Sequence, residues 1–301
     1  MLVGLGLHRR MSPEELREYQ VGWPVVQHDP DRCEGDLNPF IAEADQVLCV
    51  GVVELHQYAG FSGGWKAAIV GCGSREVLAE LHAREMVCHP EVQVGRLEGN
   101  PFRDFIDQRG SALRGSALQW TGQEWVAGDP IRALRAAGSR LDPWTEVSER
   151  ASVAVLRVPT SKAVNLYQAS RAATYLGLSP RPPLEEGALL VLDAACPEGI
   201  GRGSGELALG RLLAERRSWQ ELLEGPVPSG AGLQRAYMLA RLFSTFRMTV
   251  SGCSRPEELR AMGIDATSAS AEEVAGAGAL EVADPFHKLP QLSGASSPQL
   301  A

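Results

Sequence analysis

The second half of the chain alternates short apolar runs with helical stretches, and this alternation constrains the fold more than any other feature of the sequence. A strand, a helix and a second strand in succession place the two strands side by side and parallel, with the helix packed on the sheet. The pattern therefore predicts an α/β domain of three layers. We expect strands at 151–158, 188–195, 247–251 and 279–283, and helices at 163–176, 205–216, 231–246, 255–262 and 270–276.

The first half shows a similar but less regular pattern. The apolar segment 1–7 is a predicted strand, followed by Ser12-Pro13-Glu14-Glu15, which is typical of a helix start with a capping box. A second apolar strand is expected at 47–53, a hairpin at 117–128, and a helix from Asp129-Pro130 to about Ala137. A buried strand needs neighbours on both sides, so we expect complete relatives to carry a further segment upstream.

Length and composition set the number and kind of domains. The 301 residues suit two domains of ordinary size, and 44% hydrophobic and 22% charged residues are close to the globular average. The fold class expected is α/β, with two α/β domains and the active site in the cleft between them. We place a truncated N-terminal catalytic and cofactor domain at 1–145, a C-terminal α/β domain at 146–290, a linker near 138–150, and a flexible tail at 291–301.

Charge and cysteine usage exclude several classes of protein. The formal net charge is -8, which leaves no basic surplus for a phosphate backbone, so we expect no nucleic-acid partner. The apolar start is too short for a membrane span and has no basic segment before it, so neither a membrane anchor nor a signal peptide is expected. Scattered cysteines without a C-x-x-C pair favour the reducing cytoplasm; they are Cys33, Cys49, Cys72, Cys88, Cys196 and Cys253.

The segment from His56 to Lys66 follows the second predicted strand and is the strongest candidate for a site. It reads His-Gln-Tyr-Ala-Gly-Phe-Ser-Gly-Gly-Trp-Lys, and it lacks the Gly-Lys-Ser/Thr ending of a P-loop. Glycines beside a serine let backbone N–H groups approach a ligand, and a lysine at the end of the loop can meet a phosphate or act as a nucleophilic amine. Each feature alone is more often a tight turn with a solvated lysine; together they favour a site.

A helix expected after Ser74 places His82 four residues beyond Leu78, on the same face. A histidine on an apolar helix face is usually a hydrogen-bonded core residue, and His8 and His56 at strand ends can be simple loop donors. The segment from Gly199 to Glu206 follows a predicted strand and opens a helix, where ligand-facing loops of α/β domains lie, but it lacks the spacing of a dinucleotide fingerprint.

The motif His-x-x-Ala-Gly-Phe-Ser-Gly-Gly-x-Lys resembles the signature of the nickel-dependent lactate racemase family. The likeness continues at His82, which stands sixteen positions after Lys66, the spacing of the family's nickel ligand. It extends to the segments Gly4 to Arg9, His28-Asp29, Gly95 to Pro101 and Asn165 to Gln168. It covers most of the chain, and the last third matches mainly in pattern.

The resemblance implies a racemase or epimerase of 2-hydroxy acids that uses a nickel-pincer nucleotide, a pyridinium bisthiocarboxylic acid mononucleotide that holds nickel. It implies that Lys66 attaches the cofactor covalently, that His82 ligates nickel, and that His8 and His56 are proton acceptors on opposite faces of the substrate. Further cofactor contacts are implied for Tyr58, Ala59, Ser62, Gly63, Tyr167 and Gln168, and substrate contacts for Arg171 and Gln168. The implied partners are the substrate and the enzymes that make the cofactor.

The chemistry of a 2-hydroxy acid explains why such residues are needed. Its α-hydrogen is too weakly acidic for a histidine base, so departure as hydride to an electrophilic ring avoids a carbanion. The hydroxyl proton must still be accepted, and two imidazoles with an ordinary pKa near 6.5 suit proton movement in both directions at neutral pH.

The sequence departs from the family pattern in three places. It lacks the upstream segment, which carries a substrate-binding arginine and cofactor contacts; it is shorter between Asp29 and Glu43; and Arg171 stands where the family has lysine. Arginine grips a carboxylate through two parallel hydrogen bonds, whereas lysine is a point charge, so Arg171 could take over carboxylate binding. Three hypotheses follow: an active shortened enzyme, a non-catalytic protein that binds or senses the nickel cofactor, or a decayed relative that binds nothing.

Overall fold

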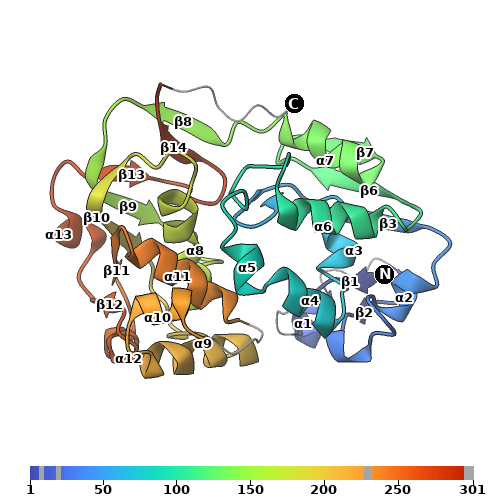
Figure 1. The fold of residues 1–301 in the computed structure, drawn as a ribbon, viewed down its shortest axis with the longest axis horizontal. Helices are drawn as coiled ribbons and strands as arrows, with labels where there is room; N and C mark the ends of the chain where they lie inside the picture. Colours follow the sequence, from blue (N-terminus) through green and yellow to red (C-terminus); the bar gives the residue numbers. More distant parts are fainter. Residues whose placement is uncertain (7–9, 18–21, 227–231, 295–301) are drawn as a thin grey trace.

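The structure, a computed structural model, describes residues 1–6, 10–17, 22–226 and 232–294. Two groups of elements lie side by side in Figure 1, with the N-terminal helices and strands on the right and the C-terminal ones on the left. This mixed α/β architecture, with parallel strands in both groups, confirms the fold class expected from the sequence. The proposed domain boundaries stay a prediction, and His8 lies outside the described residues.

A five-stranded parallel sheet forms the centre of the C-terminal group, in the order β12-β11-β10-β9-β13. The four strands predicted here are confirmed, and β12 is a short addition. The strands are β9 (Ala151–Arg157), β10 (Leu184–Asp193), β11 (Arg247–Ser251), β12 (Asp265–Ala266) and β13 (Leu280–Val282).

Helices cover both faces of this sheet, as the sequence pattern requires. Val155 and Val191 pack with Ala271 of α13 on one face, while α8 and α11 contact each other and the sheet from the other. These helices are α8 (Leu166–Gly177), α9 (Ser204–Glu215), α10 (Trp219–Glu224), α11 (Gln234–Phe243), α12 (Pro256–Ala261) and α13 (Ala271–Ala275). In Figure 1, α8 and α11 lie on the side toward the N-terminal group.

The N-terminal group has a three-stranded sheet in which β3 (Val47–Val52) pairs in parallel with β6 (Gly115–Trp120). The predicted hairpin is confirmed, because β6 runs antiparallel to β7 (Trp125–Gly128). Its helices are α1 (Pro13–Arg17), α2 (Pro39–Ala42), α3 (Lys66–Ile69), α4 (Arg75–Leu81), α5 (Arg84–Val87), α6 (Pro101–Gly110) and α7 (Pro130–Gly138), with a 3-10 turn at Pro30–Arg32. Asn100 and Asp129 cap α6 and α7 through their side-chain oxygens, each ahead of a proline.

Short strands complete the fold; β1 (Leu2–Val3) lies within the strand predicted at 1–7, and the others lie where the sequence predicted none. Within the expected linker lies β8 (Trp144–Val147), which pairs in parallel with β14 (Leu289–Leu292). The chain after Pro285 therefore carries a strand whose first three residues are buried, and this strand reaches into the segment expected as a tail at 291–301. The remaining pairs are β1 with β2 (Val26–Gln27) and β4 (Leu55–His56) with β5 (Gly60–Phe61).

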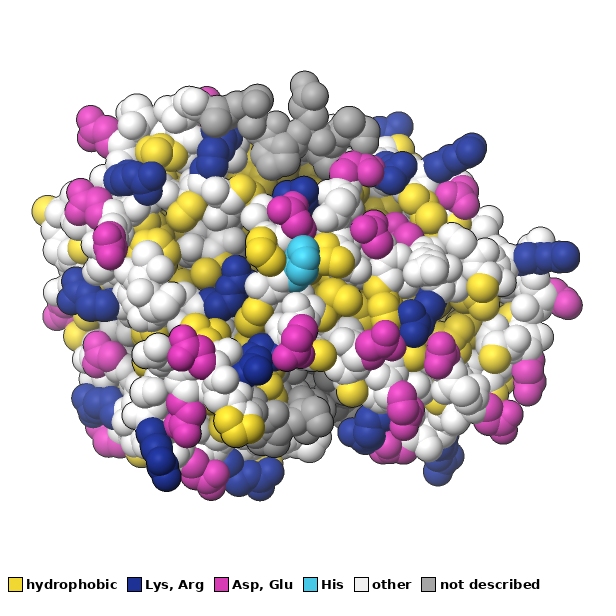
Figure 2. Space-filling model, in the orientation of Figure 1, with side chains coloured by type: hydrophobic (Ala, Val, Ile, Leu, Met, Phe, Trp, Pro, Cys, Tyr) yellow, Lys and Arg dark blue, Asp and Glu magenta, His cyan; other side chains and the backbone are white. Residues whose placement is uncertain are grey.

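The surface carries charges of both signs. On the face shown in Figure 2, acidic and basic side chains are interspersed, with apolar atoms between them and no continuous basic field. Among the described residues, no helix is long and apolar enough to cross a membrane.

An imidazole links the two groups of elements. His287 lies between Asp284, 2.9 Å from Nδ1, and Glu54, 3.7 Å from Nε2. The carboxylates of Glu54 and Asp284 raise the pKa of His287 to about 9, against the opposing effect of burial. Glu54 joins β3 to β4, so this contact connects the segment before His56 with the C-terminal group.

We expect the contribution of His287 to stability to depend on pH. Its folded-state pKa lies above the ordinary 6.5, so the contribution is complete below pH 6.5 and is lost as pH rises through about 9. Because the side chain is 54% exposed and screened by water, the effect is no more than about 1 kcal/mol. In thermal unfolding, His287→Gln should melt below wild type at pH 6 and together with it at pH 9.5; a gap that widens with pH contradicts the assignment.

Candidate active site

His56 is held by the tight turn between β4 and β5. Its Nδ1 accepts hydrogen bonds from the backbone N–H groups of Tyr58, at 3.3 Å, and Ala59, at 3.1 Å. A nitrogen that accepts such bonds carries no proton, so the neutral ring bears its proton on Nε2. Burial, assisted by the cations Lys66 and Arg171, holds the pKa of His56 well below 6.5, which keeps the ring neutral.

Glycine is required at two positions of the following loop. Gly60 has a φ of +73°, and a Cβ there would lie 1.9 Å from the carbonyl oxygen of Arg96. Gly63 has a φ of +101°, and its Cβ would lie 2.1 Å from Oε1 of Gln119. Both glycines therefore permit close packing of the loop against neighbouring segments.

Ser62 closes the loop through its hydroxyl group. The hydroxyl donates to the carbonyl of Val52, at 2.7 Å, and accepts from the N–H of Glu54, at 2.9 Å. Both partners lie at the end of β3, so this side chain fixes where the loop leaves the sheet. The cofactor contacts implied for Ser62 and Gly63 stay a prediction.

Arg103 of α6 binds the inner side of the same loop. Its guanidinium, 2% exposed, donates to the carbonyl oxygens of Ala59, at 3.2 Å, and Phe61, at 2.5 Å, with a longer bond of 3.4 Å to Gly63. Asp107, one helical turn away, is its acidic partner at 3.6 Å. The carbonyls of a tight loop point inward and need donors, and one buried guanidinium supplies them.

Lys66 begins α3 at the end of the loop and lines a cavity between the two groups of elements. Burial, assisted by Arg103 and Arg171, lowers the pKa of its amine to about 8. A larger share of this amine is therefore neutral at pH 7 than for a solvated lysine, as a nucleophile requires.

His82 follows the last residue of α4. The helix stops at Leu81 instead of including His82 as the pattern predicted, and Nδ1 of His82 donates to the carbonyl oxygen of Leu78 at 2.8 Å. Burial lowers the pKa of His82 to about 4, so the ring is neutral and its Nε2 carries a free lone pair. A neutral imidazole with one nitrogen fixed by a backbone carbonyl is the usual state of a metal-binding histidine.

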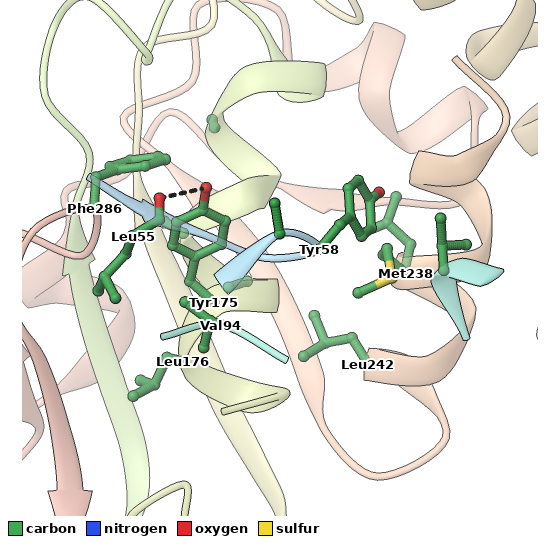
Figure 3. Packing of buried hydrophobic residues seen from close by; sticks show 14 of the residues in the cluster. Leu55, Tyr58, Val94, Tyr175, Leu176, Met238, Leu242 and Phe286 are labelled. Carbon is green, nitrogen blue, oxygen red and sulfur yellow. Dashed lines mark hydrogen bonds between the residues drawn. The ribbon is translucent and has the colours of Figure 1, made fainter. Parts of the chain in front are cut away.

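Two stacked aromatic rings hold His56 and His82 in place. Tyr58 and Phe102 lie 5.5 Å apart between ring centroids. Tyr58 meets both imidazoles edge-on at 5.8 Å, and Phe102 lies 6.4 Å from His56 and 5.7 Å from His82. The two histidines, from segments far apart in sequence, thus share one aromatic support. Figure 3 shows Tyr58 reaching toward Met238 of α11.

These side chains converge on a cavity of about 400 Å³. His56, Lys66 and His82 line it from the N-terminal group, and Tyr167, Glu206 and Gln234 from the C-terminal group. Gly203 to Gly205 line it too, so the loop singled out at 199–206 reaches the cavity. The volume lies in the range usual for small-molecule sites.

Three residues of α8 were predicted to contact cofactor or substrate, and only one of them lines the cavity. Tyr167 lines the cavity, and its hydroxyl accepts from Gln234 at 3.0 Å. Gln168 instead accepts a 3.2 Å bond from Arg171, whose other nitrogen donates to the hydroxyl of Tyr175 at 2.8 Å. Gln168 and Arg171 therefore form one hydrogen-bonded unit beside the cavity lining.

The cavity region has chemistry suited to the implied cofactor. Three buried polar atoms around it have no hydrogen-bond partner, namely the hydroxyl of Tyr58, Oε1 of Gln234 and Nε of Arg235. Across the described residues, no three His, Cys, Asp or Glu side chains converge as a metal cluster. Lys66 and His82 thus offer one amine and one imidazole, which fits a metal whose other ligands come from a bound organic group.

Sequence reasoning missed Arg103, Phe102 and Arg235. Arg103 and Phe102 follow the cap Asn100-Pro101, a signal that located the helix but not its buried face. Arg235 lies at the start of α11 and is 3% exposed. Nothing in a single sequence separates a buried arginine from the solvated arginines that most helices carry.

Known proteins resemble the chain in the segment that carries His56, Lys66 and His82. Residues 25–95 match the family described as lactate racemase N-terminal domain. The lactate racemase of Thermoanaerobacterium thermosaccharolyticum is 29% identical over 126 residues, covering 35% of this chain and 29% of the relative. That of Lactiplantibacillus plantarum is 29% identical over the same length, covering 35% and 30%. The aligned region is thus less than a third of each relative.

Solved structures show the same fold over nearly the whole chain. The lactate racemase apoprotein of T. thermosaccharolyticum superimposes with a TM-score of 0.80 at 18% identity, covering 96% of this chain and 78% of that one. A protein from Thermotoga maritima gives a TM-score of 0.70 at 16% identity, covering 97% and 85%. The likeness in sequence is thus to the N-terminal domain of lactate racemase at residues 25–95, and the likeness in fold extends over nearly the whole chain.

Loss of the Arg103 guanidinium should loosen the loop that carries His56. Arg103→Met takes the guanidinium donors away from the buried carbonyls of Ala59 and Phe61, of which Ala59 keeps only the backbone N–H of Phe61, so we expect the free energy of unfolding to fall by about 2–4 kcal/mol. Denaturant unfolding measures this. The matched control is Arg135→Met, an exposed arginine paired with Glu98, which should change stability by less than about 0.5 kcal/mol. Equal losses in both variants contradict the assignment.

Proposed function

We propose that the chain is a racemase or epimerase of 2-hydroxy acids that uses a nickel-pincer nucleotide. The observation that carries the proposal is the convergence of His56, Lys66 and His82 on one cavity, with both imidazoles neutral and the pKa of the Lys66 amine lowered to about 8. When bound, the cofactor would supply an electrophilic ring that takes up and returns hydride. The partners are a small-molecule substrate and the enzymes that make the cofactor, and the compartment is the cytoplasm.

Lys66 and His82 would hold the cofactor. The amine of Lys66, with its lowered pKa, would attach it covalently, and Nε2 of His82 would ligate nickel, for which imidazole is a suitable donor. Tyr58, Ala59, Ser62, Gly63, Tyr167 and Gln168 are proposed as the remaining cofactor contacts. Arg171 and Gln168 would grip the substrate carboxylate as one unit.

His8 and His56 would exchange the hydroxyl proton of the substrate on opposite faces. At rest, His56 presents an Nε2–H donor to an oxygen in the cavity, since Nδ1 is engaged by two amides. To accept a proton at Nε2, it must first carry its own proton on Nδ1, which breaks both backbone hydrogen bonds. Proton transfer at His56 is therefore coupled to movement of the turn at 57–59.

A second function, binding or sensing of the nickel cofactor without catalysis, has one observation in its favour. Lys66 and His82 are ready to bind as they stand, whereas His56 holds the tautomer of a donor and not of a base. A carrier would keep the first pair and need no proton acceptor. The variants below distinguish the two functions.

Lys66→Ala tests the covalent link. Intact-mass measurement on protein co-expressed with the cofactor-making enzymes should show an adduct that disappears in this variant, because no other amine lines the cavity among the described residues. The control is Lys162→Ala, which removes another of the chain's three lysines and should keep the adduct. An adduct that survives Lys66→Ala refutes the assignment.

Histidine variants separate metal binding from proton transfer. His82→Ala removes a metal donor, so nickel content should fall to near zero, whereas His8→Ala and His56→Ala should retain nickel and cofactor but block racemisation. His8→Ala and His56→Ala should each still react with one enantiomer, because each lacks the proton acceptor on only one face of the substrate. The two variants should therefore prefer opposite enantiomers. Nickel analysis and chiral assays measure this. Wild type that holds nickel and exchanges no substrate proton supports the carrier function instead.

A further inference from the structure

Two arginines without a carboxylate partner lie beside the cavity, and together they form an unbalanced positive site. Arg171 and Arg235 make no ion pair with an acidic side chain in the part of the chain that the structure describes, whereas Arg103 nearby has Asp107. A buried cation without an anion is costly, and proteins normally pair such groups or neutralise them. A bound anion would supply the missing counter-charge.

Both guanidinium groups bond to side chains of helix α8, although Arg235 itself stands on α11. Nη1 of Arg235 donates to the hydroxyl of Thr174, at 3.0 Å, and to Oε1 of Gln57, at 3.1 Å. Thr174 stands one turn after Arg171 and bonds to its carbonyl oxygen. The Arg171 guanidinium donates to Tyr175, the residue next to Thr174, and its charge adds to burial in lowering the pKa of Arg235.

Arg235 also retains hydrogen-bonding capacity that the protein does not use. Its Nε is buried with no partner, and its guanidinium lies 5.9 Å from the ring centre of Tyr167, which lines the cavity. Oε1 of the adjacent Gln234 and the hydroxyl of Tyr58 are unpartnered too. Figure 3 shows Tyr58 directed toward α11, the helix that begins with Gln234 and Arg235.

We infer that Arg171 and Arg235 form a double anion site that selects a 2-hydroxy acid with a second carboxylate. This rests on the proposed function, in which Arg171 takes the carboxylate beside the reacting carbon; Arg235 then takes the second one. A monocarboxylate such as lactate leaves Arg235 without a counter-ion. A dicarboxylate neutralises both guanidinium groups through bidentate hydrogen bonds, which are among the stronger polar contacts in proteins.

Calorimetric titration of the full chain, purified without cofactor, tests the inference directly. The probes are malate, lactate and inorganic phosphate at constant ionic strength. Malate should bind wild type at least about tenfold more tightly than lactate, the effect of one charged hydrogen bond. Arg235→Gln should reduce malate affinity to that of lactate and leave lactate unchanged, whereas Arg171→Gln should weaken both.

Controls separate charge from fold. Arg241→Gln, on the same helix and hydrogen-bonded to Val87, should alter neither affinity. Arg235→Gln removes a buried charge that lacks a partner, so its melting temperature should equal or exceed that of wild type; Arg235→Lys keeps a positive charge and should retain part of the malate preference. Because no cofactor is present, a failed adduct experiment with Lys66 leaves this measurement intact.

Three results overturn the inference. The first is equal affinity of wild type for malate and lactate. The second is a malate preference that survives Arg235→Gln. The third is phosphate binding lost in Arg235→Gln without any malate preference, which assigns this guanidinium to a phosphate group instead of a carboxylate.

Discussion

The guanidinium of Arg103 holds together the loop on which the site depends. Its donors bind the carbonyls of Ala59 and Phe61, which a tight glycine-rich turn directs inward. With the loop fixed from inside, its amides are free to bind Nδ1 of His56, and its end delivers Lys66 to the first turn of α3. The cation that organises the loop also helps to lower the pKa of the Lys66 amine.

The lowered pKa values of His56, Lys66 and His82 have a common cause. Burial in the cavity wall disfavours every charged form, and the neighbouring arginines reinforce this for His56 and Lys66. His82 is neutral mainly through burial, with its tautomer set by Leu78. Because the two imidazoles stay uncharged, the positive charge of this region is concentrated on the arginines and on the protonated share of Lys66, which suits it to binding an anionic ligand.

Much of the fold follows from local signals in the sequence. Apolar β-branched runs located β3, β9, β10 and β11, and the caps Asn100 and Asp129 with their prolines account for the starts of α6 and α7. The pairing of β8 with β14 could not be predicted, because both strands are four residues long and lie far apart in the chain. Such pairs exist only when tertiary packing brings them together.

Part of the site was predictable from a local motif in the sequence. The motif and its spacing brought His56, Lys66 and His82 together, and the structure places all three on one cavity. Arg103 and Arg235 were not found, because their importance comes from burial and not from residue type or position in a motif. Ser62 shows the converse: its place in the motif suggested a ligand contact, while its hydroxyl is bonded to Val52 and Glu54.

The lowered pKa of Lys66 has a consequence for the chemical labelling of the protein. With a pKa of about 8, roughly a tenth of this amine is unprotonated at pH 7, against less than about a thousandth for a solvated lysine. The chain has only three lysines, so few other amines compete for an acylating reagent. Among the three lysines, a reagent small enough to enter the cavity would therefore react first at Lys66, whereas a bulky one would be directed to the lysines outside it.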